Sequence, residues 1–477
     1  MAQRIGARQL VTLLDGWRAP DTQHSPAYRR LADRIKLLVL DGRLSVGAPL
    51  PAERELAARL ETSRTTVTGA YNHLRDLGYV QRRQGSGSFT RLPHGGDAEL
   101  PDRPSQIDFT SAATPASPGL HAATQQALDM FPEYLAGTGY DLRGIPELRE
   151  AVAARYTDRG LPTAAGNIVV TVGAQHASGL LMRMFGGPGR HILVESPGFP
   201  QSFDAARMSG ARLVTTPVSA DGWDAEDLLR TIRTAKPALA YVMPDFHNPT
   251  GACMPADLRT AFTRAAADAG TIVIADETTA ELAIDERQQF LPLAAYGPAI
   301  LLGSVGKTMW GGLRVGWIRA DSARVSQILQ ARPAADLGTP ILEQLICTVL
   351  LRDYRPVLDD MRLRLRASRD LVVAELGRRF PSWTVPRVRG GHTVWARLDR
   401  PVSSQLAIRA LENGLRIPPG PRFGLDGAFE RFVRVPITFD TDTTLRALDL
   451  LETSWHQVLG SSAAPCRKVP DDESLVI

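Results

Sequence analysis

The sequence predicts two domains of different fold class, a small α+β domain at the N-terminal end and a large α/β domain after it. Charge is the first observation: residues 1–90 carry a net charge of +6, from 14 basic and 8 acidic side chains, whereas the remaining residues carry −2. Pattern is the second. Beyond residue 107, short apolar runs alternate with helical segments, which is typical of a mostly parallel sheet covered by helices on both faces.

Composition narrows the class of protein. The chain has 477 residues, of which 44% are hydrophobic and 22% charged, as in ordinary soluble globular proteins. Its first residues lack the apolar segment of a signal peptide, and its apolar runs are far shorter than a membrane span. The three cysteines are scattered, without metal-ligand spacing. We therefore expect a cytoplasmic protein with free thiols, no metal site and no membrane contact.

The small domain begins with three predicted helices. The first runs from Pro26 to the stop at Gly42, and the second spans residues 50–60. Ser63 suits the N-cap of the third helix, whose buried stripe is Val67, Ala70, Tyr71 and Leu74. The exposed N-terminal face of that helix therefore carries side chains that could contact DNA bases and phosphates. They are Arg64, Thr65, Thr66 and Thr68.

A β-hairpin is predicted after the third helix. Residues 79–83 and 87–90 form its strands, and Gly85 and Gly87 would let the backbone approach a phosphate closely. Any small α+β domain could carry these periodicities. The order of the elements, together with the +6 charge, favours DNA as the partner of residues 1–90.

Two segments read as connections rather than as domains. Residues 91–106 contain three prolines and two glycines without apolar periodicity, which indicates an interdomain linker. Residues 461–477 are polar and contain proline, and we expect a disordered tail. The large domain should therefore span residues 107–460.

The strands of the large domain can be located from its apolar runs. They are residues 168–172, 191–195, 211–214, 238–243, 271–275 and 300–303. In an open parallel sheet, ligands bind at the carboxyl ends of the strands. The residues that follow these runs are therefore the candidates for a functional site.

Residues suited to a flat, phosphorylated ligand stand at these strand ends. Gly173, Ala174 and Gln175 open a helix whose amides can hold a phosphate. Phe199 could stack on a heterocycle. Asn248, in Asn-Pro-Thr-Gly, can donate to a ring oxygen. A turn or core role would explain each of these alone; together they are hard to assemble by chance.

Lys307 gives the clearest indication of which ligand binds at this site. The chain has only four lysines among 55 basic residues, and one lies between two stretches of small residues, after the last of these strands and Ser304. A primary amine condenses with an aldehyde, which a guanidinium cannot do. Arg314 suits a phosphate, and Asp276 suits a protonated pyridine nitrogen. Pyridoxal phosphate (PLP) meets all three demands, although a surface lysine in an arginine-rich chain remains the simpler alternative.

Residues 28–90 resemble the winged helix-turn-helix domain of the GntR superfamily. The matching residues are Leu50-Pro51-x-Glu53-Arg54-x-Leu56-Ala57, Ser63-Arg64-Thr65-Thr66-Val67, Gly78-Tyr79 and Gly85-Ser86-Gly87-Ser88-Phe89. The resemblance implies that DNA is contacted by Arg54, by the stretch that begins at Ser63, and by the glycines of the wing.

Residues 107–455 resemble the class I aminotransferases, which are PLP-dependent transferases of fold type I with a smaller α+β subdomain. The motifs are Asn248-Pro249-Thr250-Gly251 and Ser304-x-x-Lys307 with Arg314, supported by Gly173-x-Gln175 and Glu195-x-Pro197. By this resemblance Lys307 forms the Schiff base, Asp276 pairs with the pyridine nitrogen, Asn248 binds the ring oxygen and Phe199 stacks on the ring. It assigns the remaining roles as follows: Gln175, Ser304 and Arg314 to the phosphate, Tyr140 to the partner subunit's cofactor, and Arg434 to a ligand carboxylate.

One departure from that family bears on activity. A tyrosine normally follows the aspartate by two or three positions, but Asp276 is followed by Glu277-Thr278-Thr279. Threonine supplies no phenol, so efficient transamination is doubtful although PLP binding is not.

The order of the two domains resembles MocR-type transcriptional regulators. It implies a homodimer that binds a DNA operator and senses PLP, or an amino acid or amine through PLP. A working aminotransferase with an accessory DNA-binding module is the alternative, and a cofactor-free dimeriser is a weaker one.

Overall fold

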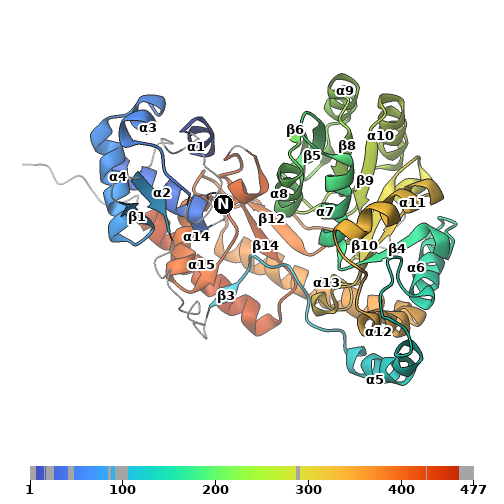
Figure 1. Cartoon of the computed structure of the whole chain (residues 1–477). Helices are drawn as coiled ribbons and strands as arrows, with labels where there is room; N and C mark the ends of the chain where they lie inside the picture. Colours follow the sequence, from blue (N-terminus) through green and yellow to red (C-terminus); the bar gives the residue numbers. More distant parts are fainter. Residues whose placement is uncertain are drawn as a thin grey trace, which may run out of the picture.

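The computed structural model of the chain has three parts (Figure 1). It describes residues 7–14, 17, 26–40, 44, 48–83, 87–91, 106–285, 290–425 and 427–460. A small N-terminal domain lies beside a subdomain built from the C-terminal third of the chain. The large α/β subdomain stands on the other side of that C-terminal subdomain (Figure 1).

The N-terminal domain is a helical bundle with a β-hairpin. Its elements are α1 (Ala7–Leu13), α2 (Ala27–Leu40), α3 (Glu53–Arg59), α4 (Arg64–Asp76), β1 (Val80–Arg83) and β2 (Gly87–Thr90). The predicted N-cap is confirmed, because the Ser63 side chain accepts from the Thr66 amide at 3.0 Å. The predicted stripe of α4 is also confirmed as buried. Helix α1 was not predicted; Leu10, Leu14 and Trp17 pack into this core.

The large subdomain is organised around a sheet of eight strands. They are β4 (Ile168–Thr171), β5 (His191–Ser196), β6 (Arg212–Ser219), β7 (Gly222–Trp223), β8 (Leu239–Val242), β9 (Ile272–Asp276), β10 (Ile300–Ser304) and β11 (Gly316–Arg319), in the order β4-β11-β10-β9-β8-β5-β6-β7. The run from β10 to β6 is parallel, as predicted. Strand β11 was not predicted, and it lies antiparallel between β4 and β10.

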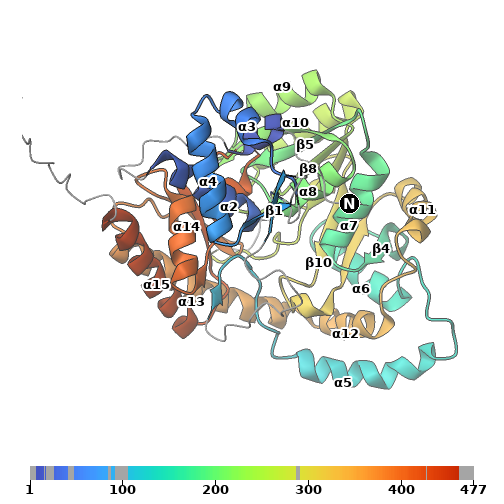
Figure 2. The same ribbon diagram turned by 60° about the vertical axis from the view of Figure 1, so that its left-hand side comes forward.

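Helices cover both faces of this sheet (Figure 2). They are α6 (Pro146–Asp158), α7 (Ala174–Phe185), α8 (Pro200–Met208), α9 (Ala225–Ala235), α10 (Ala256–Ala269), α11 (Ser322–Ala331) and α12 (Ile341–Arg352). Helix α5 (Leu120–Met130) packs against α12. One apolar core joins the sheet to α6, α9, α10 and α12, and another joins it to α7, α8 and α11. Two hydrophobic faces on one sheet are why its strands read as continuous apolar runs.

The C-terminal subdomain has its own core. Its elements are α13 (Tyr354–Arg379), β12 (Thr393–Arg397), α14 (Ser403–Glu412), β13 (Leu415–Arg416), β14 (Phe432–Pro436) and α15 (Thr441–Gly460). Strand β3 (Ile107–Asp108) pairs in parallel with β13. The chain that leaves the N-terminal domain therefore enters the C-terminal subdomain first.

Short 3₁₀ turns occupy Phe131–Tyr134, Ala165–Asn167, Leu293–Ala295, Gly311–Leu313, Arg332–Ala334 and Gly420–Phe423.

The N-terminal domain packs on the C-terminal subdomain through α2 and α14, which lie side by side in both views (Figures 1 and 2). The Arg34 side chain of α2 is 6% exposed, forms an ion pair with Glu430 and donates to Ser404 Oγ at 3.0 Å. Lys36 lies 3.9 Å from Glu412 in α14. Within the described ranges, no helix has the length and hydropathy required to cross a bilayer.

Candidate functional site

Residues from four strand ends and from the C-terminal subdomain converge on one pocket. Phe199 follows β5, Asn248 follows β8, and Asp276 is the last residue of β9. They line the pocket together with Lys307, which follows β10, and with His392 and Thr393 of the C-terminal subdomain. The structure thus brings together four residues that lie up to 108 positions apart and that the sequence had singled out.

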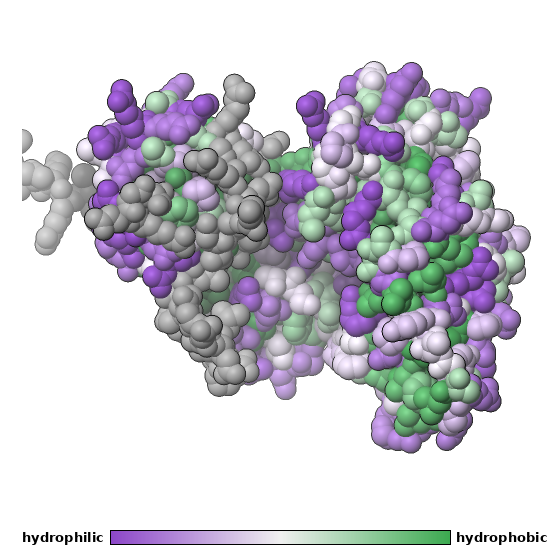
Figure 3. Space-filling model, in the orientation of Figure 1, coloured by the Kyte–Doolittle hydropathy of each residue, from purple (hydrophilic) through white to green (hydrophobic). Residues whose placement is uncertain are grey.

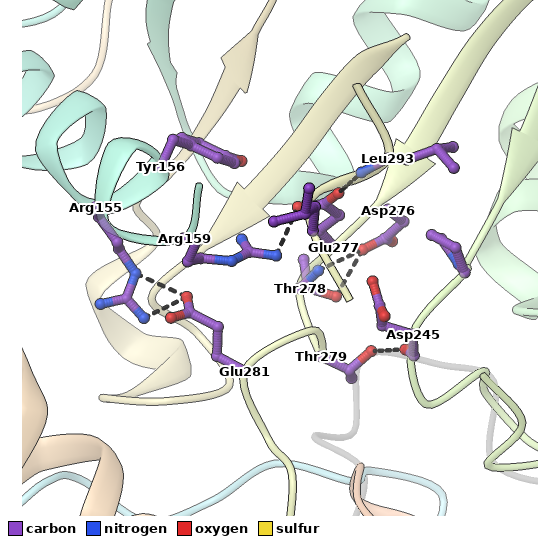
Figure 4. Close-up of polar contacts among 12 residues, drawn as sticks. Arg155, Tyr156, Arg159, Asp245, Asp276, Glu277, Thr278, Thr279, Glu281 and Leu293 are labelled. Atoms are coloured by element: carbon purple, nitrogen blue, oxygen red, sulfur yellow. Dashed lines mark hydrogen bonds and ion pairs between the residues drawn. The ribbon is translucent and has the colours of Figure 1, made fainter. Parts of the chain in front are cut away.

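Three donors hold the Asp276 carboxylate at the base of the pocket. The Tyr241 hydroxyl donates to one oxygen. The amide and the hydroxyl of Thr278 donate to the other oxygen at 3.0 and 2.7 Å (Figure 4). Burial and the Asp276 charge raise the pKa of Tyr241 well above its usual range, so this phenol stays a donor. Sequence analysis missed Tyr241 because it resembles any aromatic residue in a buried strand.

The neighbouring side chains fix the same segment from its other side (Figure 4). The Thr279 hydroxyl donates to the Asp245 carbonyl at 2.8 Å. Glu277 is buried against Arg159 at 3.1 Å, and Glu281 forms an ion pair with Arg155. Neither threonine hydroxyl is therefore free to replace the phenol that is missing after Asp276.

Lys307 is held as a partly buried amine. Its Nζ donates to the carbonyl of Ala112 at 2.7 Å. Burial, and then the positive charge of Arg434, lower the pKa of Lys307 to about 8, against the opposing effect of Asp276. A lowered pKa increases the neutral, nucleophilic fraction of an amine near neutral pH.

Arg434 lies on β14, near enough to Lys307 for its charge to act on that amine. Its guanidinium donates to the carbonyls of Thr110 and Phe109 at 2.5 and 3.4 Å, and stacks over the Phe423 ring at 5.1 Å. Burial lowers the pKa of Arg434 to about 10. Arg434 Nε has no hydrogen-bond partner among the described residues. We term residues 109–112 the strap. Backbone carbonyls of the strap thus hold both Arg434 and Lys307.

The N-terminus of α7 and Arg314 form a second, more exposed group. Gly173 caps α7 with φ +81°, and Ala174 and Gln175 are the first residues of the helix. A Cβ on Gly173 would lie 2.9 Å from a guanidinium nitrogen of Arg314, so glycine allows the cation to lie over this turn. Free amides and a cation at a helix N-terminus suit an anion such as phosphate.

Two other predicted residues, Ser304 and Glu195, form hydrogen bonds that fix the backbone around the site. Ser304 Oγ accepts from the Gly306 amide and donates to the Val315 carbonyl, both at 3.0 Å. Glu195 is buried and accepts from the Trp223 indole and the Met243 amide, both at 2.9 Å. Ser304 thus shapes the turn before Lys307, and Glu195 fastens β5 to β8.

One predicted residue lies elsewhere. The Tyr140 side chain is 71% exposed and does not line the pocket of its own chain. Gly85 lies outside the described residues.

His392 is a pocket residue that sequence analysis missed. Burial and the positive charge of Lys307 lower its pKa to about 3, so its imidazole is neutral. The signal was a double glycine, because Gly390 and Gly391 bring the chain against Phe246, where a Cβ on Gly390 would come within 2.4 Å of the ring. Such a close approach leaves no room for a side chain at Gly390.

The predicted DNA-contacting residues form an exposed group on the N-terminal domain. Arg54, Ser63, Arg64 and Thr65 are exposed, and Thr66 is partly exposed. Thr68 instead donates to Glu53 at 2.7 Å, which ties α4 to α3. Gly87 has φ +96° at the start of β2, with open space around it. These features leave the N-terminal end of α4 free to meet a ligand.

Comparison with known proteins matches both parts of the chain. Residues 120–451 match the model of aminotransferase class I and II, and residues 27–90 match that of bacterial regulatory proteins of the gntR family. The 2-aminoadipate transaminase of Thermus thermophilus is 30% identical over 56% of this chain and 70% of its own length. The probable rhizopine catabolism regulatory protein MocR of Rhizobium meliloti is 26% identical over 83% of this chain and 86% of its own length.

Among solved structures, the fold is similar to that of the alpha-aminoadipate aminotransferase LysN of Thermus thermophilus. The TM-score is 0.68 at 26% identity, and the match covers 75% of this chain and 93% of LysN. The transferase likeness thus stops short of the N-terminal domain, whereas the likeness to the regulator spans both parts.

Proposed function

We propose that this chain senses an amino acid or amine through PLP and passes the signal to a DNA operator. The chain belongs to the class I and II aminotransferase family and carries a gntR-family DNA-binding domain in front of it. The two domains make it a transcriptional regulator of the MocR type, and PLP is the cofactor that the aminotransferase domain implies. One observation carries the sensing step: the strap holds Lys307 and Arg434 at the same time.

The residues present fit PLP. When bound, PLP supplies an aldehyde that condenses with primary amines and a ring that withdraws electrons. Lys307 would hold the aldehyde carbon, Asp276 the ring nitrogen, Asn248 the ring oxygen and Phe199 the ring face. The phosphate would take Arg314 and Ser304 together with Ala174 and Gln175 at the N-terminus of α7. The buried Asn248 Oδ1, which has no partner among the described residues, supports a polar ligand at this place.

Sensing requires that a ligand bind two states of the protein differently. On binding, the cofactor would replace the Ala112 carbonyl as the partner of Lys307. A ligand carboxylate would replace the carbonyls of the strap as the partner of Arg434. An amino acid that displaces Lys307 from the cofactor and pairs its carboxylate with Arg434 would then change both contacts. Because β3, at residues 107–108, directly precedes the strap and directly follows the linker, this change lies on the covalent path to the DNA-binding domain.

A second path runs through the C-terminal subdomain. Glu430, the partner of Arg34 in the DNA-binding domain, lies four residues before Arg434 on the same chain segment. A movement of β14 on ligand binding would therefore reach the contact between α14 and α2. The proposed DNA-contacting residues are those exposed around Arg64.

The absence of a tyrosine in the segment that follows Asp276 favours regulation over catalysis. The hydroxyls of Thr278 and Thr279 are committed to Asp276 and to the Asp245 carbonyl, so neither supplies the missing phenol. Asn248 would then be the side chain that holds the ring oxygen. Weaker polarisation of the cofactor suits a protein that binds an amine without turning it over.

We also propose a homodimer, acting in the cytoplasm on paired half-sites. Hydrophobic surface gathers over α5 (Figure 3). Exposed apolar side chains also lie on adjoining segments of the large subdomain, namely Leu128, Leu135, Tyr140, Trp310 and Leu337. A two-fold contact on this surface would bury them and bring Tyr140 to the partner's pocket.

Transcription from the target promoter tests the proposal. Reporter output would be measured for wild type, Lys307→Ala and Arg434→Ala, with PLP alone and with PLP plus a panel of amino acids. We expect Lys307→Ala to lose every response, and Arg434→Ala to lose only the response to carboxylated ligands. If PLP alone is the effector, Arg434→Ala will respond as wild type does. A normal response from Lys307→Ala would refute both versions.

A further inference from the structure

The Tyr241 phenol reaches the cofactor pocket through Asp276. Tyr241 lies on β8 and pairs with Ile274 of the neighbouring strand β9, two residues before Asp276. Side chains two positions apart on a strand point to the same face of a sheet, so the phenol and the carboxylate meet on that face. Both residues are buried, and the phenol donates to Asp276 Oδ2. Asp276 in turn lines the pocket.

The Asp276 carboxylate has room for one further donor among the described residues. A carboxylate offers about four lone pairs, which are divided between its two oxygens. Oδ1 accepts from the amide and the hydroxyl of Thr278, whereas Oδ2 accepts from Tyr241. The acceptor position that is left is therefore on Oδ2. A ring nitrogen that binds Asp276 would share this oxygen with the phenol.

The proton between the ring nitrogen and Asp276 has two possible places. On the ring nitrogen it makes the ring strongly electron-withdrawing, and on Asp276 it leaves both partners uncharged. Burial opposes separated charges and favours the uncharged pair, but hydrogen bonds donated to a carboxylate favour its charged form. Burial and the Asp276 charge raise the pKa of Tyr241 well above its usual range, so the phenol keeps its proton and donates.

We infer that Tyr241 is a positioning residue of the cofactor site, which keeps Asp276 ionised and thereby keeps the proton on the ring nitrogen. This inference rests on the proposed function, since it takes Asp276 as the partner of the ring nitrogen. It also states what the site retains. Electron withdrawal at the ring nitrogen is preserved through Tyr241, although the segment after Asp276 supplies no phenol to the ring oxygen.

NMR of the full-length protein, loaded with PLP that is isotopically labelled at the ring nitrogen, shows where the proton lies. For wild type we expect the signal of a protonated ring nitrogen. Tyr241→Phe removes the hydroxyl alone and leaves both Thr278 donors in place. Losing one hydrogen bond to a charged group should shift the proton about tenfold to a hundredfold toward Asp276, which displaces the signal toward that of an unprotonated ring. Thr278→Val, which removes a donor from Oδ1, should displace it in the same direction.

Tyr156→Phe is the matched control. It removes another buried phenol of the same subdomain, which accepts from the Trp317 indole at 3.1 Å, so the signal should stay as in wild type. The inference is overturned if Tyr241→Phe leaves the signal unmoved or displaces it the other way. It is also overturned if Tyr156→Phe displaces the signal as far as Tyr241→Phe does.

Asp276→Asn separates this inference from the proposed function. If Asp276→Asn displaces the signal and Tyr241→Phe does not, Asp276 holds the ring nitrogen without help from Tyr241 and the inference alone fails. If Asp276→Asn binds PLP with the wild-type signal, Asp276 does not hold the ring nitrogen, and that part of the proposed function fails together with the inference.

Discussion

Replacing Arg34 by methionine should release the DNA-binding domain from the C-terminal subdomain. The Arg34 side chain is 6% and that of Glu430 22% exposed, so the ion pair is largely removed from water. Removing one member of a buried pair costs about 3–5 kcal/mol. Glu430 keeps donors from Ser403 and Ser404, among them the Ser404 amide at 3.0 Å. We therefore expect a cost below that range, about 2–3 kcal/mol, which is roughly a 30- to 150-fold weaker docking equilibrium.

Amide hydrogen exchange would measure this equilibrium where the two parts meet. Amides of α2 and of the first turn of α14 should exchange faster in Arg34→Met, because undocking exposes both helices. Amides in the core of the large sheet should not change. A double-mutant cycle with Glu430→Gln should give a coupling energy of about 2 kcal/mol, since the second substitution adds little once the pair is broken.

Lys36→Met is the matched control. It removes the same charge from the same helix, but its pair with Glu412 spans 3.9 Å and that glutamate is 47% exposed. Exposed pairs contribute about 0–1 kcal/mol, so exchange at α14 should barely change. Equal effects from Arg34→Met and Lys36→Met, or an additive cycle, would show that the Arg34–Glu430 pair does not hold the two parts together.

Further predictions concern the cofactor and DNA. Purified wild type should absorb in the visible range, with the cofactor fixed to the chain by borohydride, and Lys307→Ala should show neither property; a colourless wild type after incubation with excess PLP would contradict this. The rate of PLP loading should rise as pH passes through about 8, where the Lys307 amine loses its proton, and flatten above it. Arg434→Met removes a positive neighbour and should move that midpoint to higher pH; an unmoved or lower midpoint would count against the electrostatic coupling. In gel shifts Arg64→Ala should weaken operator binding by about 1–3 kcal/mol, whereas Arg75→Ala, at the far end of α4, should cost far less; equal losses would indicate net charge rather than base contact.

The sequence by itself determined the parts of this protein that depend on local pattern. Ser63 could be recognised as an N-cap, and four residues of α4 as its buried stripe, because capping and helical spacing act within one turn. The strands around the site could be located because a sheet with two buried faces requires continuous apolar runs. Asp276 and Lys307 could be singled out because their chemistry is rare at strand ends.

Only the tertiary structure decided how these parts act on one another. The contact of Lys307 with the strap joins residues 195 positions apart, and that of Arg34 with Glu430 joins residues 396 apart. No local period encodes such pairs, since each depends on how whole elements pack. The same holds for Tyr241 and His392, which look like ordinary core residues until the fold places one against Asp276 and the other against Lys307. Helix α1 and strand β11 escaped prediction because their short patterns gain order only from the cores that they join.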